Sequence, residues 1–219
     1  SSAFAASPQA GLLMAIPPQG ATSEYQFFSA NDSGLNRRDL GIVGSVAISG
    51  GAATFDGSSM ATSVYSEITI ASAFSVSTWV KPSTTNDMTV FSVGYSANIQ
   101  DFFGIDHLSA VGFWRTVVRD TGGRQASAIS DKPLGVGAWT HLAAVYTPKT
   151  LSIYANGVYV SSETNAALSG WRCNRAAIGA LYRNTTTLYF TGDVGNTLIY
   201  DKALSADEVW SLYCLGAKK

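Results

Sequence analysis

The chain of 219 residues is 46% hydrophobic and 13% charged, and its formal net charge is −1. The apolar content is too high for a disordered chain, and the length suits one β domain with a sizeable core. Lys and Arg form no run longer than a pair, so the basic patch that binds nucleic acid is not expected. The longest apolar stretch, residues 12–16, is far shorter than the roughly 20 residues of a membrane-spanning helix.

The chain divides into a flexible N-terminal arm, residues 1–10, and a single domain, residues 11–219. Because the first residue is Ser, we expect a trimmed N-terminus from which a signal peptide has been removed. The two cysteines, Cys173 and Cys214, are expected to form a disulfide, with two buried free thiols as the alternative. A disulfide favours an oxidising compartment, so the predicted location is extracellular or surface-exposed.

Strand signals recur at short intervals, with β-branched and aromatic residues alternating with Ser or Thr between turn residues. In residues 74–81, Phe74, Val76, Thr78 and Val80 share one face of a predicted strand that stops at Pro82. Similar segments are residues 43–49, 53–56, 66–70, 89–93, 112–118, 124–130 and 139–146. Asn156 and Gly157 join two alternating runs in residues 151–161 and predict a tight type I′ hairpin.

One segment predicts a helix. Ser205 and Glu208 have the spacing of a capping box, and Val209, Leu212 and Tyr213 are spaced to face a core. Many strands and a single short C-terminal helix indicate an all-β sandwich.

Several segments, in order, resemble the concanavalin A-like, laminin-G-like jelly-roll family, which includes pentraxin-like domains. They are residues 31–34, 53–59, 74–82, 137–146, 151–160 and 192–204. The resemblance covers residues 12–215 and implies a two-sheet antiparallel jelly-roll sandwich of six or seven strands per sheet. It does not imply one function, because this fold carries lectins, glycan-binding modules, glycosidases, lyases and adhesive modules.

Many relatives carry an Asp-Glu pair, which commonly helps to hold a structural calcium, where this chain has Gly195 and Asn196. Losing a carboxylate weakens a site for calcium, which prefers six to eight oxygen ligands. The sequence therefore indicates no firm cofactor. The calcium candidates that remain are Asp32, Asp56 and Asp193.

The sequence predicts no enzyme. Glycosidases on this fold carry carboxylates at alternate positions of one strand, whereas no two of the 15 acidic residues here are two or four positions apart. Asp101 and Asp106 are expected to be solvated loop carboxylates. His141 is expected to be a packed structural histidine, and His107 lies in a predicted loop where it could contact a ligand.

Sugar recognition needs flat apolar rings with fixed hydrogen-bonding groups around them. Three stretches couple an aromatic residue with an arginine: Trp114 with Arg115, Trp171 with Arg172, and Tyr182 with Arg183. Together with Asp101, His107, Asn98 and Gln100 they are the predicted ligand site. Ordinary packing of Trp114 and Trp171 is the alternative. Trp79 and Trp139 are expected in the core, and Trp210 is expected to pack against the domain.

The favoured function is a noncatalytic, extracellular, lectin-like module for adhesion or carbohydrate binding, with a glycan or cell-surface polysaccharide as partner. The alternative is a structural or assembly domain of a virion or cell surface that contacts other protein subunits. A glycan binder should present aromatic rings among polar groups, and an assembly domain should expose a broad apolar patch.

Overall fold

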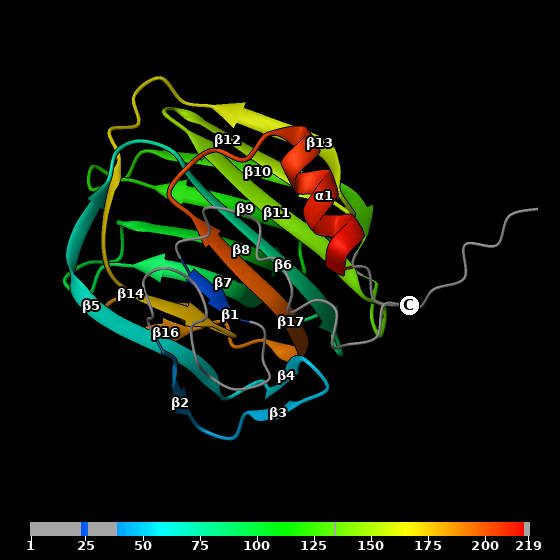
Figure 1. Cartoon of the computed structure of the whole chain (residues 1–219). Helices are drawn as coiled ribbons and strands as arrows, with labels where there is room; N and C mark the ends of the chain where they lie inside the picture. The colour runs from blue at the N-terminus through cyan, green and yellow to red at the C-terminus, as the bar shows by residue number, and fades with distance from the viewer. Residues whose placement is uncertain (1–22, 26–38, 134, 217–219) are drawn as a thin grey trace, which may run out of the picture.

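The computed structural model describes residues 23–25, 39–133 and 135–216, so the predicted arm at residues 1–10 and Asp32 lie outside the described residues. The described part contains 17 strands and one helix, and its two large sheets face each other (Figure 1). The predicted all-β, two-sheet jelly-roll sandwich with one C-terminal helix is confirmed.

One large sheet has eight antiparallel strands. Its order is β13 (Val158–Thr164), β12 (Thr150–Ala155), β11 (Thr140–Thr147), β6 (Phe74–Pro82), β17 (Thr191–Tyr200), β4 (Ala52–Asp56) and β3 (Ala47–Ser49), and β1 (Ser23–Tyr25) also pairs with β17. The other large sheet has seven antiparallel strands. Its order is β10 (Gln125–Pro133), β9 (Phe113–Arg119), β8 (Phe102–Leu108), β7 (Met88–Gly94), β14 (Trp171–Ile178), β5 (Met60–Ile70) and β2 (Gly41–Val43). A third, two-stranded sheet joins β15 (Leu181–Tyr182) and β16 (Thr186–Thr187).

The core lies between the two large sheets, and an aromatic cluster occupies part of it. Trp171 stacks on Phe103 with ring centroids 5.8 Å apart and meets Phe74 and Tyr146 edge-on at 5.9 and 4.9 Å. Phe74, Val76 and Val80 of β6 belong to the same core, as the alternation predicted. Aromatic contacts in these geometries add stabilisation beyond the buried area.

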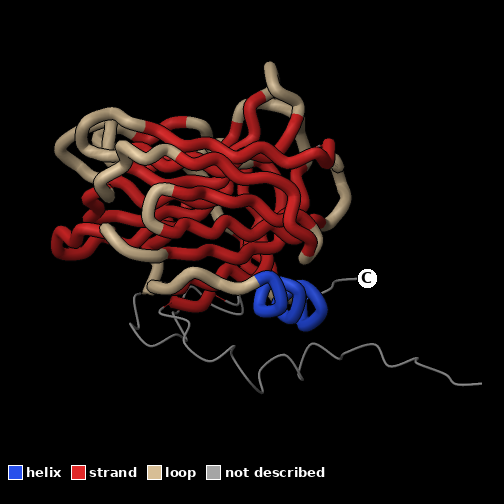
Figure 2. Tube along the Cα trace, turned by 90° about the horizontal axis from the view of Figure 1, so that it is seen from above, coloured by secondary structure: helices blue, strands red, loops and turns tan. Residues whose placement is uncertain are grey.

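Helix α1 (Ala206–Gly216) covers the outer face of the eight-stranded sheet, and Figure 2 shows it against one side of the strand layers. Val209 and Leu212 bury their side chains against that face. The predicted capping box is confirmed: the Ser205 amide donates to Glu208 Oε2 at 2.8 Å, and the Glu208 amide donates to Ser205 Oγ at 3.2 Å. No helix in the described ranges is long and apolar enough to span a bilayer.

The predicted hairpin between β12 and β13 is also confirmed. Asn156 and Gly157 have φ angles of 50° and 79°, as a type I′ turn requires. Position 157 needs glycine for a second reason, because a Cβ at Gly157 would lie 2.8 Å from the Trp210 ring. The turn therefore also makes room for α1.

Strands β8 and β14 were missing from the predicted elements. Almost every residue of β8 is buried on both faces of the sheet, so its sequence shows no polar alternation. In β14 a register shift between Cys173 and Arg175 interrupts the period of two. Both strands lie inside the seven-stranded sheet, where β8 carries Asp106 and His107 and β14 carries Trp171 and Arg172.

The predicted disulfide is wrong, because both cysteines are free thiols. Cys173 is fully buried in the core on β14, whereas Cys214 is exposed on α1. The eight-stranded sheet lies between them, since α1 packs on its outer face and Cys173 lies against its inner face. The cysteines therefore give no support for an oxidising compartment.

Trp171→Ala should lower the free energy of unfolding by about 3–5 kcal/mol, because it leaves a cavity in the aromatic cluster. Trp210→Ala is the matched control, since Trp210 is 49% exposed, and it should change the free energy by less than about 1 kcal/mol. Urea denaturation of both variants checks this. Equal effects would mean that Trp171 does not lie in the core.

Candidate functional site

The two tryptophans proposed as ligand contacts do not reach the surface. Trp114 is 0% and Trp171 is 1% exposed, and both indoles lie in the core between the sheets. Each indole Nε1 is buried with no hydrogen-bond partner. The packing alternative is therefore correct for both residues, and their predicted role as surface ligand contacts is wrong.

The arginines beside them in sequence point the other way, because side chains alternate along a strand. Arg115 and Arg119 of β9 and Arg172 and Arg175 of β14 lie on the outer face of the seven-stranded sheet, where Arg183 joins them from the turn between β15 and β16. We call these five residues the arginine face. Arg119 and Arg175 were not predicted, although Arg119 is four positions from Arg115 and so shares its face of the strand.

Aromatic rings hold four of these guanidinium groups. Arg119 and Arg183 both lie over the Phe102 ring, 5.3 and 5.0 Å from its centroid. Arg175 lies 4.3 Å from the Tyr182 centroid, and Arg172 lies 4.4 Å from that of Tyr95. Both tyrosines are half-buried, so apolar rings and cationic donors share this surface.

Asp101 and Asp106 each pair with one arginine of this face. Asp101 is fully buried and accepts hydrogen bonds from Asn98, Thr121 and Arg172, with the Arg172 Nη2 atom 3.2 Å from Oδ2. Burial alone would raise the pKa of Asp101, but these hydrogen bonds and the Arg172 charge hold it below the ordinary value of 3.8.

Asp106 accepts two hydrogen bonds from Arg115, at 2.9 Å from Nε and 2.7 Å from Nη2. Burial raises the pKa of Asp106, and the hydrogen bond to Asp106 raises the pKa of Arg115. The prediction that Asp101 and Asp106 are solvated loop carboxylates is wrong. Both are buried and serve to fix an arginine.

The other three arginines have no carboxylate partner among the described residues. Arg119 donates to Gln125 Oε1 at 3.2 and 2.7 Å, Arg175 Nη1 donates to the Arg183 carbonyl at 2.7 Å, and Arg183 Nη1 donates to the Ile99 carbonyl at 2.7 Å. The Nε atoms of Arg175 and Arg183 are buried without a partner. Burial and the charge of Arg119 lower the pKa of Arg183. Positive charge on this face is therefore only partly compensated.

Arg183 is placed by a chain segment that lies close against β7. Ser92 Oγ donates to the Ala180 carbonyl at 2.8 Å and accepts from the Tyr182 amide at 3.0 Å. A Cβ on Gly94 would lie 2.6 Å from the Tyr182 carbonyl oxygen, so only glycine allows this approach. Small residues on β7 thus bring Tyr182 and Arg183 onto the sheet.

The remaining polar candidates support the fold around this face. His107 lies in β8 rather than in a loop and is 1% exposed, with Nδ1 3.0 Å from the Asn86 carbonyl oxygen, so its predicted loop position is wrong. Asn98 Oδ1 accepts from the amides of Gln100 and Asp101 and so shapes the turn before β8.

His141 is a structural residue, as predicted. Its Nε2 lies 2.8 Å from Ser77 Oγ, and burial lowers its pKa to about 3. Trp79 is buried, but between the eight-stranded sheet and Tyr213 of α1 rather than between the sheets. The expected core position of Trp139 is wrong, because Trp139 is half-buried beside Lys81. Trp210 packs against the domain as predicted, close to Gly157 of the β12–β13 turn, although 49% of it stays exposed.

The two described calcium candidates, Asp56 and Asp193, are both engaged in hydrogen bonds within the protein. Asp193 accepts from Thr54 Oγ1 at 2.7 Å through one oxygen and from the Lys81 ammonium at 2.9 Å through the other. The Lys81 ammonium therefore partly neutralises Asp193. Asp56 accepts from the amide and hydroxyl of Ser58, and hydrogen bonds from Ser58 lower its pKa. Among the described residues no group of three His, Cys, Asp or Glu is arranged to hold a metal.

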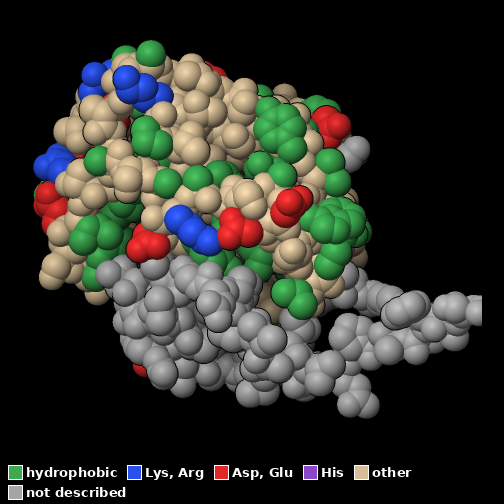
Figure 3. All heavy atoms as spheres, turned by 45° about the horizontal axis from the view of Figure 1, so that its top comes forward, with side chains coloured by type: hydrophobic (Ala, Val, Ile, Leu, Met, Phe, Trp, Pro, Cys, Tyr) green, Lys and Arg blue, Asp and Glu red, His purple; other side chains and the backbone are tan. Residues whose placement is uncertain are grey.

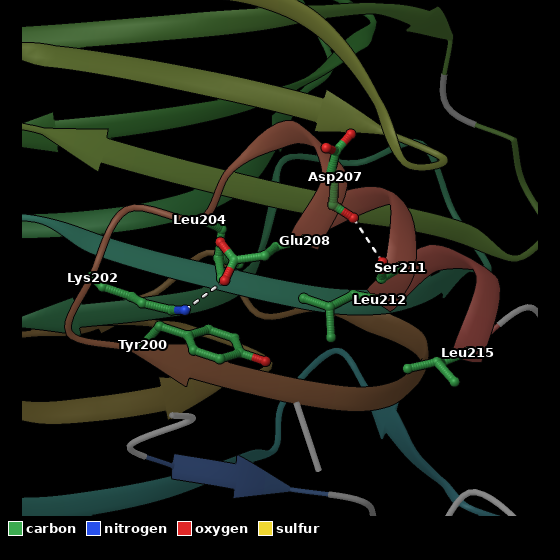
Figure 4. A pocket seen from close by; sticks show the side chains of 8 residues that line it. All are labelled: Tyr200, Lys202, Leu204, Asp207, Glu208, Ser211, Leu212 and Leu215. Carbon is green, nitrogen blue, oxygen red and sulfur yellow. Dashed lines mark hydrogen bonds and ion pairs between the residues drawn. The ribbon is translucent and has the colours of Figure 1, made fainter. Parts of the chain in front are cut away.

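A pocket of about 290 Å³ lies beside α1 (Figure 4). Its lining is Tyr200, Lys202, Leu204, Asp207, Glu208, Ser211, Leu212 and Leu215. Lys202 and Glu208 point toward one another and form an ion pair at 2.6 Å. Because Glu208 also caps α1, the charged groups of this pocket serve to attach the helix.

An apolar patch lies next to this pocket, where α1 meets β13. We define it as Tyr159, Trp210 and Leu215, which are 51%, 49% and 53% exposed. Figure 3 shows hydrophobic side chains gathered on this side of the molecule. Exposed apolar groups of this kind are typical of contact surfaces.

A family model described as the concanavalin A-like lectin/glucanases superfamily matches residues 49–210, so the chain belongs to that superfamily. A search of curated proteins finds no match to this chain. Solved structures with the same fold include domain 4 of AbnA, a GH43 extracellular arabinanase from Geobacillus stearothermophilus, in complex with arabinotriose, and two botulinum neurotoxin domains. The AbnA domain is 22% identical with a TM-score of 0.68, and the match covers 89% of this chain and 98% of that domain.

The toxin structures are the binding domain of serotype G and the ligand binding domain of serotype D in complex with N-acetylneuraminic acid. They are 17% and 14% identical, with TM-scores of 0.69 and 0.71, and each match covers 89% of this chain. The chain spans only about half of their length, 51% and 50%. These similarities establish the fold.

Asp101→Asn should lower the free energy of unfolding by about 3 kcal/mol at neutral pH, because it leaves Arg172 without its buried partner. Since the folded-state pKa of Asp101 lies below 3.8, its contribution is complete above that value and is lost as the pH falls through the folded-state pKa. Urea unfolding at about pH 7 and about pH 3 measures the difference. Asp207→Asn on the exposed start of α1 is the control. If Asp101→Asn lowers the free energy of unfolding equally at both pH values, the ionised Asp101 carboxylate does not stabilise the fold through Arg172.

Proposed function

We propose that this chain is a noncatalytic, extracellular glycan-binding module that binds its ligand on the arginine face. The observation that carries the proposal is the set of half-buried tyrosine rings and fixed guanidinium donors on the outer face of the seven-stranded sheet. Pyranose rings pack their C–H side on aromatic rings, while fixed donors select among the oxygen atoms. A surface that offers both suits a glycan.

The solved structures of the same fold support a glycan as ligand. The AbnA domain holds arabinotriose, belongs to an extracellular enzyme and is matched over 98% of its length. The serotype D toxin domain holds N-acetylneuraminic acid, although this chain spans half of it. An extracellular location for this chain is part of the proposal.

The geometry of the acidic residues favours binding over catalysis. A glycosidase needs two carboxylates that flank the scissile bond and are free to exchange a proton or attack. On this face the buried Asp101 and Asp106 are engaged with Arg172 and Arg115. Such fixed carboxylates suit a binding surface.

The second candidate function is an assembly domain, and the apolar patch favours it. Tyr159, Trp210 and Leu215 are all about half-exposed on or beside α1. In this alternative the patch contacts other protein subunits of a cell surface or a virion.

A glycan array with the purified chain tests the proposal. Tyr182→Ala should weaken glycan binding about tenfold, because it removes the ring beside Arg175. Tyr159→Ala in the apolar patch is the matched control and should leave binding unchanged, and thermal melts verify that both variants fold. If the folded parent binds no glycan but self-associates, and Tyr159→Ala abolishes that association, the assembly function replaces the proposal.

A further inference from the structure

The positive charge of the arginine face points to the class of ligand. The whole chain has a formal net charge of −1, yet five of its 14 Lys and Arg residues gather on this face. Two of the five are neutralised by buried aspartates, Arg115 by Asp106 and Arg172 by Asp101. Arg119, Arg175 and Arg183 are bonded only to uncharged groups in the described part of the chain.

Two of these like charges share one aromatic ring. Arg119 and Arg183 lie over one ring, that of Phe102, and the Arg119 charge acts on Arg183. Like charges on a partly buried surface destabilise the fold unless an anion lies between them. Local conflicts of this kind are expected where a protein binds its ligand.

The guanidinium groups of Arg119, Arg175 and Arg183 are fixed in position but do not use all of their N–H donors. Arg175 and Arg183 each donate one hydrogen bond to a backbone carbonyl, and Arg119 donates two to the Gln125 side chain. A guanidinium has five N–H donors in a planar fork that fits a carboxylate or sulfate in a bidentate manner. Because the side chains are already ordered, an oxyanion can bind them at little entropic cost.

We propose that the arginine face selects an acidic glycan, whose carboxylate or sulfate group binds between Arg119 and Arg183 while its sugar ring contacts Tyr182. The proposal rests on the proposed function and adds the charge of the ligand. Carboxylate and sulfate share the oxyanion chemistry that the guanidinium groups recognise.

The test is calorimetric titration of the full chain with three polysaccharides: a polyuronate, a sulfated polymer and a neutral polymer of similar length. The two acidic arms distinguish a carboxylate from a sulfate. Acidic polymer should bind at least about tenfold more tightly than neutral polymer, and its affinity should fall as salt is added.

The double variant Arg119→Gln, Arg183→Gln should remove that preference, while Arg119→Lys, Arg183→Lys should retain the salt dependence and lose part of the affinity. Lys149→Gln, Lys202→Gln is the matched control, because it removes two charges from the side of the eight-stranded sheet, and it should leave the preference intact. Circular dichroism and thermal melts establish that each variant folds.

The outcomes separate this inference from the proposed function. Equal binding of acidic and neutral polymers, unchanged in the glutamine variant, overturns the acidic ligand and leaves the glycan-binding proposal standing. The inference is also overturned if the control variant Lys149→Gln, Lys202→Gln loses the acidic preference to the same extent, because the attraction would then come from overall charge. Failure of the folded chain to bind any of the three, or any glycan on an array, overturns both.

Discussion

Alternation of side chains along β8, β9 and β14 is the constraint on which the candidate site depends. In a strand, a residue that points into the core sends its neighbours to the opposite face. Burial of Phe103, Trp114 and Trp171 therefore directs Phe102, Arg115 and Arg172 outward, onto one surface. The hydrophobic effect that closes the sandwich thus also directs the β9 and β14 arginines outward, whereas Arg183 additionally depends on Ser92 and Gly94 of β7.

The charges on this surface divide into two kinds with different roles. The pairs of Asp101 with Arg172 and of Asp106 with Arg115 satisfy buried carboxylates and hold the sheet surface in place. Arg119, Arg175 and Arg183 are ordered by rings, an amide and carbonyls, which fix position without neutralising charge. The aspartate–arginine pairs stabilise the sheet surface, and the other three arginines give that surface an attraction for anions.

The fold could be predicted from local patterns, such as the alternation in β6, the Asn156-Gly157 turn and the capping box at Ser205. The site was predicted in part. Pairing each tryptophan with its neighbouring arginine found the right segments, but β8 and β14 were not recognised as strands, so the opposite directions of Trp171 and Arg172 were missed. The register shift in β14 and the burial of β8 on both faces hide the period of two. The placement of Arg119 and Arg183 over the same Phe102 ring depends on long-range contacts that no local sequence pattern contains.

The most direct test of ligand binding on the arginine face is an NMR titration of the isotope-labelled chain with an acidic oligosaccharide, following backbone amides and arginine Nε–H signals. The account predicts that the largest shifts fall on Arg119, Arg175, Tyr182 and Arg183, with the buried Nε–H signals of Arg175 and Arg183 among them. Shifts confined to Tyr159, Trp210 and Leu215, on or beside helix α1, would contradict it and place ligand binding on the apolar patch.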